Sequence, residues 1–157
     1  MEESILNAFG KMTYGIYILT TFHEKMVNGM VASWVSQVSY GPPMVMVAIH
    51  PNRYSHTLIE RSGYFALHIL AQNQAHLLKS FKGTDPAAKF ASVSWNRGKT
   101  GCPILSACLA YLECQVKAVY SPGNHTLFVG EVKEAVRLSD GVPLSTRDYA
   151  GVYLGKT

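Results

Sequence analysis

Charged residues and long apolar runs are scarce in this chain of 157 residues, of which only 15% are charged. Soluble domains average roughly 25%, so part of the surface is expected to be covered by a bound group or a second subunit. The longest apolar run, Met44–Ile49, is far below the roughly 20 residues of a membrane span. The N-terminus is short and acidic at Glu2 and Glu3 and does not resemble a targeting segment, so a cytoplasmic location is expected. At 48% apolar residues, the chain can bury the core of one domain, expected to span 1–157.

Metal-binding and disulfide patterns are also missing. The three cysteines, Cys102, Cys108 and Cys114, are odd in number and lack a Cys-x-x-Cys spacing, so neither a disulfide framework nor a zinc or dithiol site is predicted. The six histidines show no His-Glu-x-x-His motif. No metal site is predicted.

The net charge of +4 and the pI near 9.0 raise the question of nucleic-acid binding. The basic residues cluster between 79 and 99, where they are separated by glycines and lack interleaved aromatic residues or a recognisable reading helix. This pattern argues against nucleic acid and favours a patch that attracts the phosphates of a small molecule. The chain also lacks a Gly-x-Gly-x-x-Gly motif, which argues against a Rossmann core.

Polar side chains are concentrated in two clusters between residues 28 and 57. The second cluster places Asn52, Arg53, Ser55 and Thr57 just before or within a predicted short helix. Guanidinium and hydroxyl donors at a helix N-terminus suit a phosphate. The alternative interpretation is an ordinary helix cap beside a surface arginine.

The apolar periodicity predicts a mainly β fold of the α+β class with short peripheral helices. Helices are expected over 2–12, 55–62 and 72–81, and strands over 14–22, 44–49, 64–70, 108–120, 126–136 and 149–154, with one further strand that starts after the turn at 23–25 and ends near Val38.

Several short motifs occur in an order that resembles the flavin reductase-like, FMN-binding split-barrel family, which includes flavoredoxin. They are GIYILTT at 15–21, NGMVASW at 28–34, PPMV at 42–45, the Arg-x-Ser-x-Thr of 53–57, Phe-x-Gly at 81–83, Gly-x-Pro at 101–103, LEC at 112–114 and NHTLFVGEV at 124–132. The resemblance runs from about Phe9 to Val136. Relatives often have Gly-Asp-His where this chain has Gly123, Asn124 and His125.

The resemblance implies a homodimeric split β-barrel that holds FMN at its subunit interface, with the flavin ring against 28–37 and the phosphate near 53–57. Reduced NADH or NADPH would act as a transient reductant. The resemblance, together with the hydrogen-bonding groups of these segments, assigns the following residues to the cofactor: Asn28, Gly29, Met30, Val31, Ala32, Ser33, Trp34, Ser36, Gln37, Asn52, Arg53, Ser55, Thr57 and Lys89.

Three of the assigned residues have a simpler alternative. Lys89 is a second phosphate ligand or a solvated lysine. His125, which matches the family histidine near the flavin, contacts the nicotinamide or is a turn residue without a role. Trp34 walls the flavin ring or belongs to the core.

The sequence therefore predicts an NAD(P)H-dependent flavin oxidoreductase in which the flavin accepts hydride and the protein orients it. One alternative is a flavoredoxin-like carrier that exchanges electrons with a redox protein partner. The other is a non-catalytic ligand-binding split barrel, because fold alone does not fix function.

Overall fold

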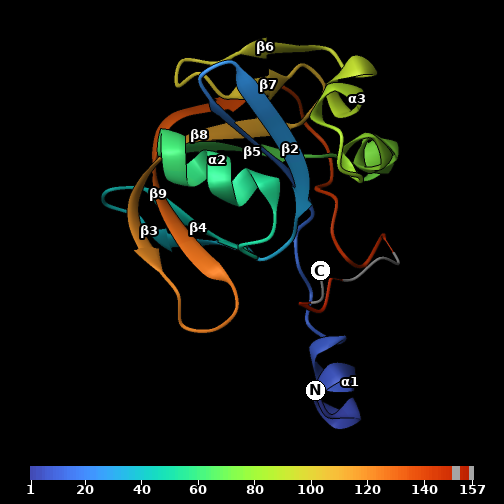
Figure 1. Ribbon diagram of the computed structural model, residues 1–157. Coiled ribbons are helices and arrows are strands. Elements are labelled where there is room, and N and C mark those ends of the chain that lie inside the picture. Colours follow the sequence, from blue (N-terminus) through green and yellow to red (C-terminus); the bar gives the residue numbers. More distant parts are fainter. Residues whose placement is uncertain (150–152, 156–157) are drawn as a thin grey trace.

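The computed structural model describes residues 1–149 and 153–155 and contains one large sheet flanked by short helices (Figure 1). The seven strands of this sheet follow the order β2-β1-β5-β8-β9-β4-β3, and all neighbours are antiparallel. Two further strands, β6 and β7, form a separate hairpin. In chain order, the elements are α1 (Glu3–Phe9), β1 (Tyr17–His23), β2 (Met26–Ala32), β3 (Val35–Ser39), β4 (Met44–Ile49), α2 (Tyr54–Ser62), β5 (Tyr64–Ile69), the 3-10 helix η1 (Gln72–Phe81), α3 (Pro86–Ala91), β6 (Trp95–Arg97), β7 (Pro103–Leu105), β8 (Ala110–Tyr120) and β9 (Thr126–Arg137).

The sheet is curled into a barrel whose two edge strands do not pair. β2 and β3 are the opposite edges of the sheet, yet only Ser33 and Trp34 separate them in the chain. Three consecutive Cα–Cα steps reach at most about 11 Å, so the two edges must lie close together. The mainly β class and the split barrel expected from the sequence are thereby confirmed.

The barrel carries apolar side chains on both faces. The inner face holds one buried cluster, which includes Leu19, Val47, Phe65 and Phe128. The outer face holds a second cluster, covered by η1, α3 and the β6-β7 hairpin, with Leu78, Phe81, Phe90 and Leu105 among its members. Alternation along β1 explains the division, because Ile18 belongs to the outer cluster and Leu19 to the inner one.

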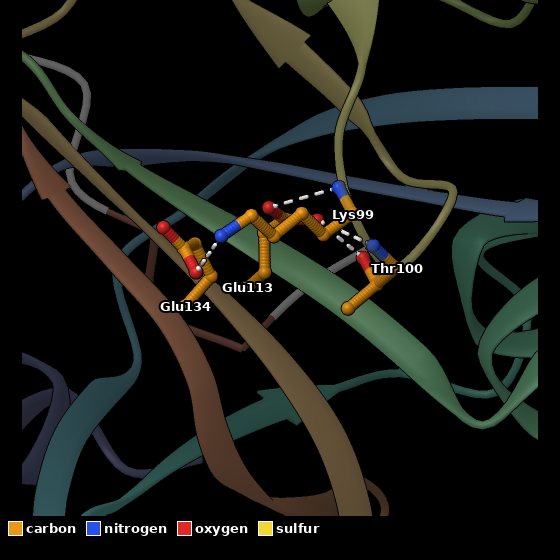
Figure 2. Close-up of polar contacts among 4 residues, drawn as sticks. All are labelled: Lys99, Thr100, Glu113 and Glu134. Atoms are coloured by element: carbon orange, nitrogen blue, oxygen red, sulfur yellow. Dashed lines mark hydrogen bonds and ion pairs between the residues drawn. The ribbon is translucent and has the colours of Figure 1, made fainter.

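The β6-β7 hairpin is fastened to β8 by a buried carboxylate (Figure 2). Glu113, 1% exposed, accepts hydrogen bonds from the backbone N–H and hydroxyl of Thr100 at 2.9 and 2.6 Å, and from the N–H of Lys99 at 3.3 Å. Lys99 also pairs with Glu134 on β9 at 2.8 Å, in the more exposed part of the same cluster.

Most predicted elements are present, and four expectations need correction. The strand expected to run on to Val38 is broken at Ser33 and Trp34, which carry the chain from one sheet edge to the other. The helix over 72–81 has 3-10 geometry, and a helix and two strands lie within 86–105, where the sequence predicted no element. Of the strand expected over 149–154, residues 150–152 lie outside the described residues, and Tyr149, Tyr153 and Leu154 are not in a strand.

Candidate active site

Two adjoining cavities lie where β2 ends, β4 ends and α2 begins. The first, called the Trp34 cavity, has a volume of about 350 Å³, within the size range of small-molecule sites. The second, called the Lys89 cavity, has a volume of about 370 Å³. Arg53 lines both cavities and so marks their junction.

The Trp34 cavity is walled by apolar and aromatic side chains. Its lining comprises Ile16, Met30, Val31, Ala32, Ser33, Trp34, Ala48, Ile49, His50, Arg53, Phe81, Lys82, His125, Thr146, Tyr149 and Tyr153. The indole Nε1 of Trp34 is buried and has no hydrogen-bond partner among the described residues. An indole N–H is only a donor, and a buried donor needs an acceptor, so this wall suits a ligand that carries an acceptor on an apolar frame.

His125 lies against Trp34 within this cavity. The two ring centroids are 4.7 Å apart, and His50 meets His125 edge-on at 5.2 Å. Burial, and secondarily the nearby His50, lower the pKa of His125 below its ordinary value. The ring is therefore held in its neutral form near pH 7.

The Lys89 cavity carries two cations and no acidic side chain among the residues that line it. The lining consists of Asn28, Asn52, Arg53, Tyr54, Gly83, Thr84 and Lys89. Burial, and secondarily the positive charge of Arg53, lower the pKa of Lys89. An anion between the two would favour the charged amine, and this site has the donors that a phosphate requires.

Helix α2 adds to this cationic environment because it begins at the same cavity. Arg53 is its N-cap residue and makes no side-chain capping bond, and Tyr54, the first helical residue, lines the Lys89 cavity. First-turn N–H groups lack the usual partner four residues earlier, although His56 N donates to the carbonyl of Arg53 at 3.0 Å. The helix dipole favours an anion at this end. The sequence placed this helix start one residue later, at Ser55.

Lys89 is not a solvated lysine. Its side chain is 5% exposed, and Nζ donates to Oδ1 of Asn28 at 3.1 Å and to the carbonyl oxygen of Gly29 at 2.8 Å. The amide of Asn28 donates in turn to Oγ of Ser55 at 2.9 Å. A polar chain thus links α3, β2 and α2 beneath the cavity.

The structure brings most, but not all, of the sequence-predicted residues to these cavities. Met30, Val31, Ala32, Ser33, Trp34 and His125 line the first, Asn28, Asn52 and Lys89 line the second, and Arg53 lines both. Ser55 is fully buried and supports Asn28, and Gly29 is covered by the ring of Phe81. Thr57, half-buried on α2, lines neither cavity.

Ser36 and Gln37 lie elsewhere. They are on β3 and line a third cavity of about 410 Å³, called the Tyr17 cavity, whose other walls are mostly apolar residues of β1, β4, β5, β8 and β9. Within this one chain they are not brought together with the residues of the other two cavities.

Several lining residues were not foreseen from the sequence, among them His50, Lys82, Tyr149 and Tyr153. His50 follows the buried strand β4 directly, a position that could have drawn attention to it. Lys82, Tyr149 and Tyr153 carry no comparable signal, because tertiary packing alone brings them to the Trp34 cavity.

Comparison with known proteins identifies the family. The model of the flavin reductase like domain matches residues 9–152. This chain belongs to the flavin reductase-like family. It is 36% identical over 139 residues to the reductase component of 4-nitrophenol 4-monooxygenase/4-nitrocatechol 2-monooxygenase from Rhodococcus opacus, covering 88% of this chain and 74% of that protein.

Two further similarities extend the comparison. The Ferric-chelate reductase (NAD(P)H) of Archaeoglobus fulgidus is 31% identical over 156 residues, covering 97% of this chain and 92% of the relative. The structure of the NADH:FAD oxidoreductase SgcE6 of Streptomyces globisporus, in complex with NAD and FAD fragments, superposes with a TM-score of 0.83 at 27% identity, covering 90% and 85% of the two chains.

Other site types find no support in the described part of the chain. No group of three or more His, Cys, Asp or Glu residues there could hold a metal ion. No helix there is long and apolar enough to cross a membrane.

Proposed function

We propose that this chain is an NAD(P)H-dependent flavin reductase that binds FMN, with the flavin ring in the Trp34 cavity and the phosphate in the Lys89 cavity. The observation that carries the proposal is the junction of the two cavities at Arg53. The Trp34 cavity has mainly apolar and aromatic walls beside Arg53 and Lys82, the Lys89 cavity has polar walls and the cations Arg53 and Lys89, and FMN has a flat ring system joined to a phosphate. The family match supports the same reaction class.

Different residues contact the phosphate and the ring of FMN. Arg53 and Lys89 hold the phosphate, and their mutual repulsion is relieved by its charge. Met30, Val31 and Ala32 form an apolar wall that excludes water, while Trp34 offers a buried N–H to an acceptor on the ring. When bound, the flavin supplies the redox chemistry, because it accepts a hydride from the reduced nicotinamide.

His125 is assigned to the nicotinamide. Its neutral ring has Nδ1 bonded to Oδ1 of Asn124, so Nε2 is the nitrogen that can accept a hydrogen bond at the wall of the Trp34 cavity. The NH₂ group of a nicotinamide carboxamide is a matching donor, so His125 would orient the dinucleotide and would not transfer a proton itself.

The proposal includes a homodimer and a cytoplasmic location. The Tyr17 cavity is lined by half-buried apolar side chains, including Val35, Met44, Ile69 and Val132, which a second copy of the chain would cover. The three free, buried cysteines suit a reducing compartment. Sedimentation equilibrium of the purified protein tests the dimer, and a monomer at micromolar concentration would reject it.

The test of the activity is anaerobic reduction of FMN by NADH or NADPH, followed as loss of the visible flavin absorbance. Bleaching of excess FMN by catalytic amounts of protein supports the reductase. Bound flavin that stays oxidised until a redox protein is added would instead identify an electron carrier. Absence of flavin binding would leave a ligand-binding barrel of another kind.

A further inference from the structure

The side chain of Tyr153 lies inside the Trp34 cavity, against the two aromatic residues that the proposed function uses. Its ring centroid is 4.9 Å from that of Trp34 and 5.7 Å from that of His125. Its hydroxyl lies 2.6 Å from Nε2 of His125. The chain thus places one of its own aromatic rings beside the histidine.

This contact leaves His125 without a free ring nitrogen. Nδ1 lies 2.7 Å from Oδ1 of Asn124, and an amide oxygen only accepts, so Nδ1 carries the hydrogen. Nε2 is then the acceptor, and it receives the hydroxyl hydrogen of Tyr153. A ligand can bond to Nε2 only after Tyr153 has left it.

Residues 144–146 are fixed by backbone hydrogen bonds, from Thr146 N to the carbonyl of Tyr14 at 2.9 Å and from Leu144 N to the carbonyl of Leu70 at 2.8 Å. The contacts of Tyr153 with the cavity are those of its side chain. Gly155 follows the same surface, because a Cβ there would lie 3.0 Å from Cη2 of Trp34. Such side-chain contacts can be exchanged for a ligand without breaking a sheet.

The chemistry of this side chain resembles that of the expected ligand. A nicotinamide is a flat aromatic ring with one hydrogen-bonding substituent, and tyrosine offers the same combination. We propose that Tyr153 occupies the nicotinamide position beside His125 and competes with the dinucleotide, so that its side chain is an autoinhibitory plug. The inference rests on the proposed function, because it takes His125 as the residue that meets the nicotinamide.

The test is the affinity of the FMN-loaded protein for NAD⁺, measured by isothermal titration calorimetry in three variants. Tyr153→Phe keeps the ring and removes the hydroxyl, so NAD⁺ should bind about three- to tenfold more tightly, as expected for loss of one competing hydrogen bond. Tyr153→Ala removes the ring as well and should bind NAD⁺ at least as tightly as Tyr153→Phe. The control Tyr40→Ala changes a tyrosine that is 91% exposed, and it should bind as the unchanged protein does.

A second measurement observes the contact without turnover. In the protein without ligands, the ¹⁵N chemical shift of His125 Nε2 should move when Tyr153 is changed to Phe. In the unchanged FMN-loaded protein, saturating NAD⁺ should move the ¹³C-labelled Tyr153 ring signals toward those of an exposed tyrosine.

The outcomes separate the two proposals. If FMN binds and NADH reduces it, but both Tyr153 variants bind NAD⁺ no more tightly than the unchanged protein, the plug alone is wrong. An Nε2 shift that is identical in Tyr153→Phe would also reject it. If no variant binds FMN or oxidises NADH, the proposed function fails and the competition fails with it.

Discussion

Lys89 on α3 donates from Nζ to Oδ1 of Asn28 on β2 over 3.1 Å, so the residue that closes the cationic cavity is fastened to the edge strand of the barrel. The two residues are 61 positions apart in the chain. Their contact, with the bond from Nζ to the carbonyl of Gly29, holds the amine of this lysine, which is 5% exposed, at the wall of the cavity that Arg53 also lines. The amine is therefore preorganised for an anion.

Replacing Lys89 by Met should weaken FMN binding selectively. A hydrogen bond to a charged group contributes roughly 1.5–3 kcal/mol, so the dissociation constant of FMN should rise about tenfold or more. Riboflavin has the same ring without the phosphate, and its affinity should change little. Fluorescence titration with both flavins measures the difference.

Equal loss of FMN and riboflavin affinity in Lys89→Met would contradict the phosphate assignment. It would mean that the change deforms the cavity through Asn28 and Gly29, the two residues that accept from Nζ. A urea unfolding curve of the flavin-free variant separates that case, because a deformed cavity would accompany a clear loss of stability.

Replacing Arg53 by Ala should raise the pKa of Lys89 as well as weaken FMN binding. The positive charge of Arg53 is the second cause that lowers this pKa, after burial. Removing it returns the pKa of Lys89 part of the way toward its ordinary value. The ¹⁵N or ¹³Cε shift of the Lys89 side chain, followed against pH, gives this value directly.

The matched control is Arg53→Lys, which keeps the charge and loses the forked geometry of the guanidinium. It should leave the pKa of Lys89 nearly as low as in the unchanged protein, while FMN affinity still falls. If Arg53→Ala retained FMN with unchanged affinity, the phosphate site would have to lie elsewhere.

The sequence predicts those parts of the fold that depend on residues close together in the chain. The alternation of apolar and polar residues, or a run of apolar residues, is enough to predict β4, β5 and the β8-β9 hairpin, because these strands are defined by their own side chains and turn residues. The break at Ser33 and Trp34 cannot be predicted from the neighbouring residues, since the residues on both sides are typical of strands. The position of β2 and β3 at opposite edges follows only from how the whole sheet curls.

The candidate site likewise combines residues that a local pattern indicates with residues that only tertiary packing brings there. Arg53 and Asn28 could be predicted as lining residues from the sequence because they lie in dense polar clusters of a recognisable motif. Lys89 is assigned through the family resemblance, with a solvated lysine as the alternative, but its burial against Asn28 depends on how α3 packs against β2, which no local pattern gives. Tyr153 reaches His125 across 28 positions, and a tyrosine in a stretch predicted to be a strand carries no signal for that contact.

Replacing Glu113 by Gln should destabilise the attachment of the β6-β7 hairpin. The carboxylate accepts from Lys99 N, Thr100 N and Thr100 Oγ1 (Figure 2). A glutamine retains one acceptor oxygen, and its NH₂ group would face donors, so the free energy of unfolding should fall by about 1–3 kcal/mol. Urea denaturation measures this loss.

The same cluster offers a control. Glu134→Gln removes the charge that pairs with Lys99 at 2.8 Å, and that lysine side chain is 76% exposed. Exposed ion pairs contribute about 0–1 kcal/mol, so this variant should be nearly as stable as the unchanged protein. Equal losses in both variants would show that the hairpin is held mainly by its apolar contacts.

Protonation of His68 should destabilise the fold at acidic pH. The side chain is fully buried between β1, β5 and β7: Nδ1 donates to the carbonyl of Ile18 at 3.0 Å, and Nε2 accepts from Leu105 N at 3.0 Å. Burial lowers its pKa from 6.5 to about 4, partly offset by the bond to Ile18. Below about pH 6.5 the unfolded chain therefore binds a proton that the folded protein does not.

The resulting stability is present above about pH 6.5 and is lost as the pH falls toward about 4, amounting to about 2 kcal/mol between pH 7 and pH 4.5. Urea unfolding at several pH values gives the curve, and His68→Gln should lower the stability at neutral pH while flattening this part of it. His76→Gln changes an exposed histidine on η1 and should retain the slope of the unchanged protein. A slope that survives in His68→Gln would assign the acid sensitivity to another group.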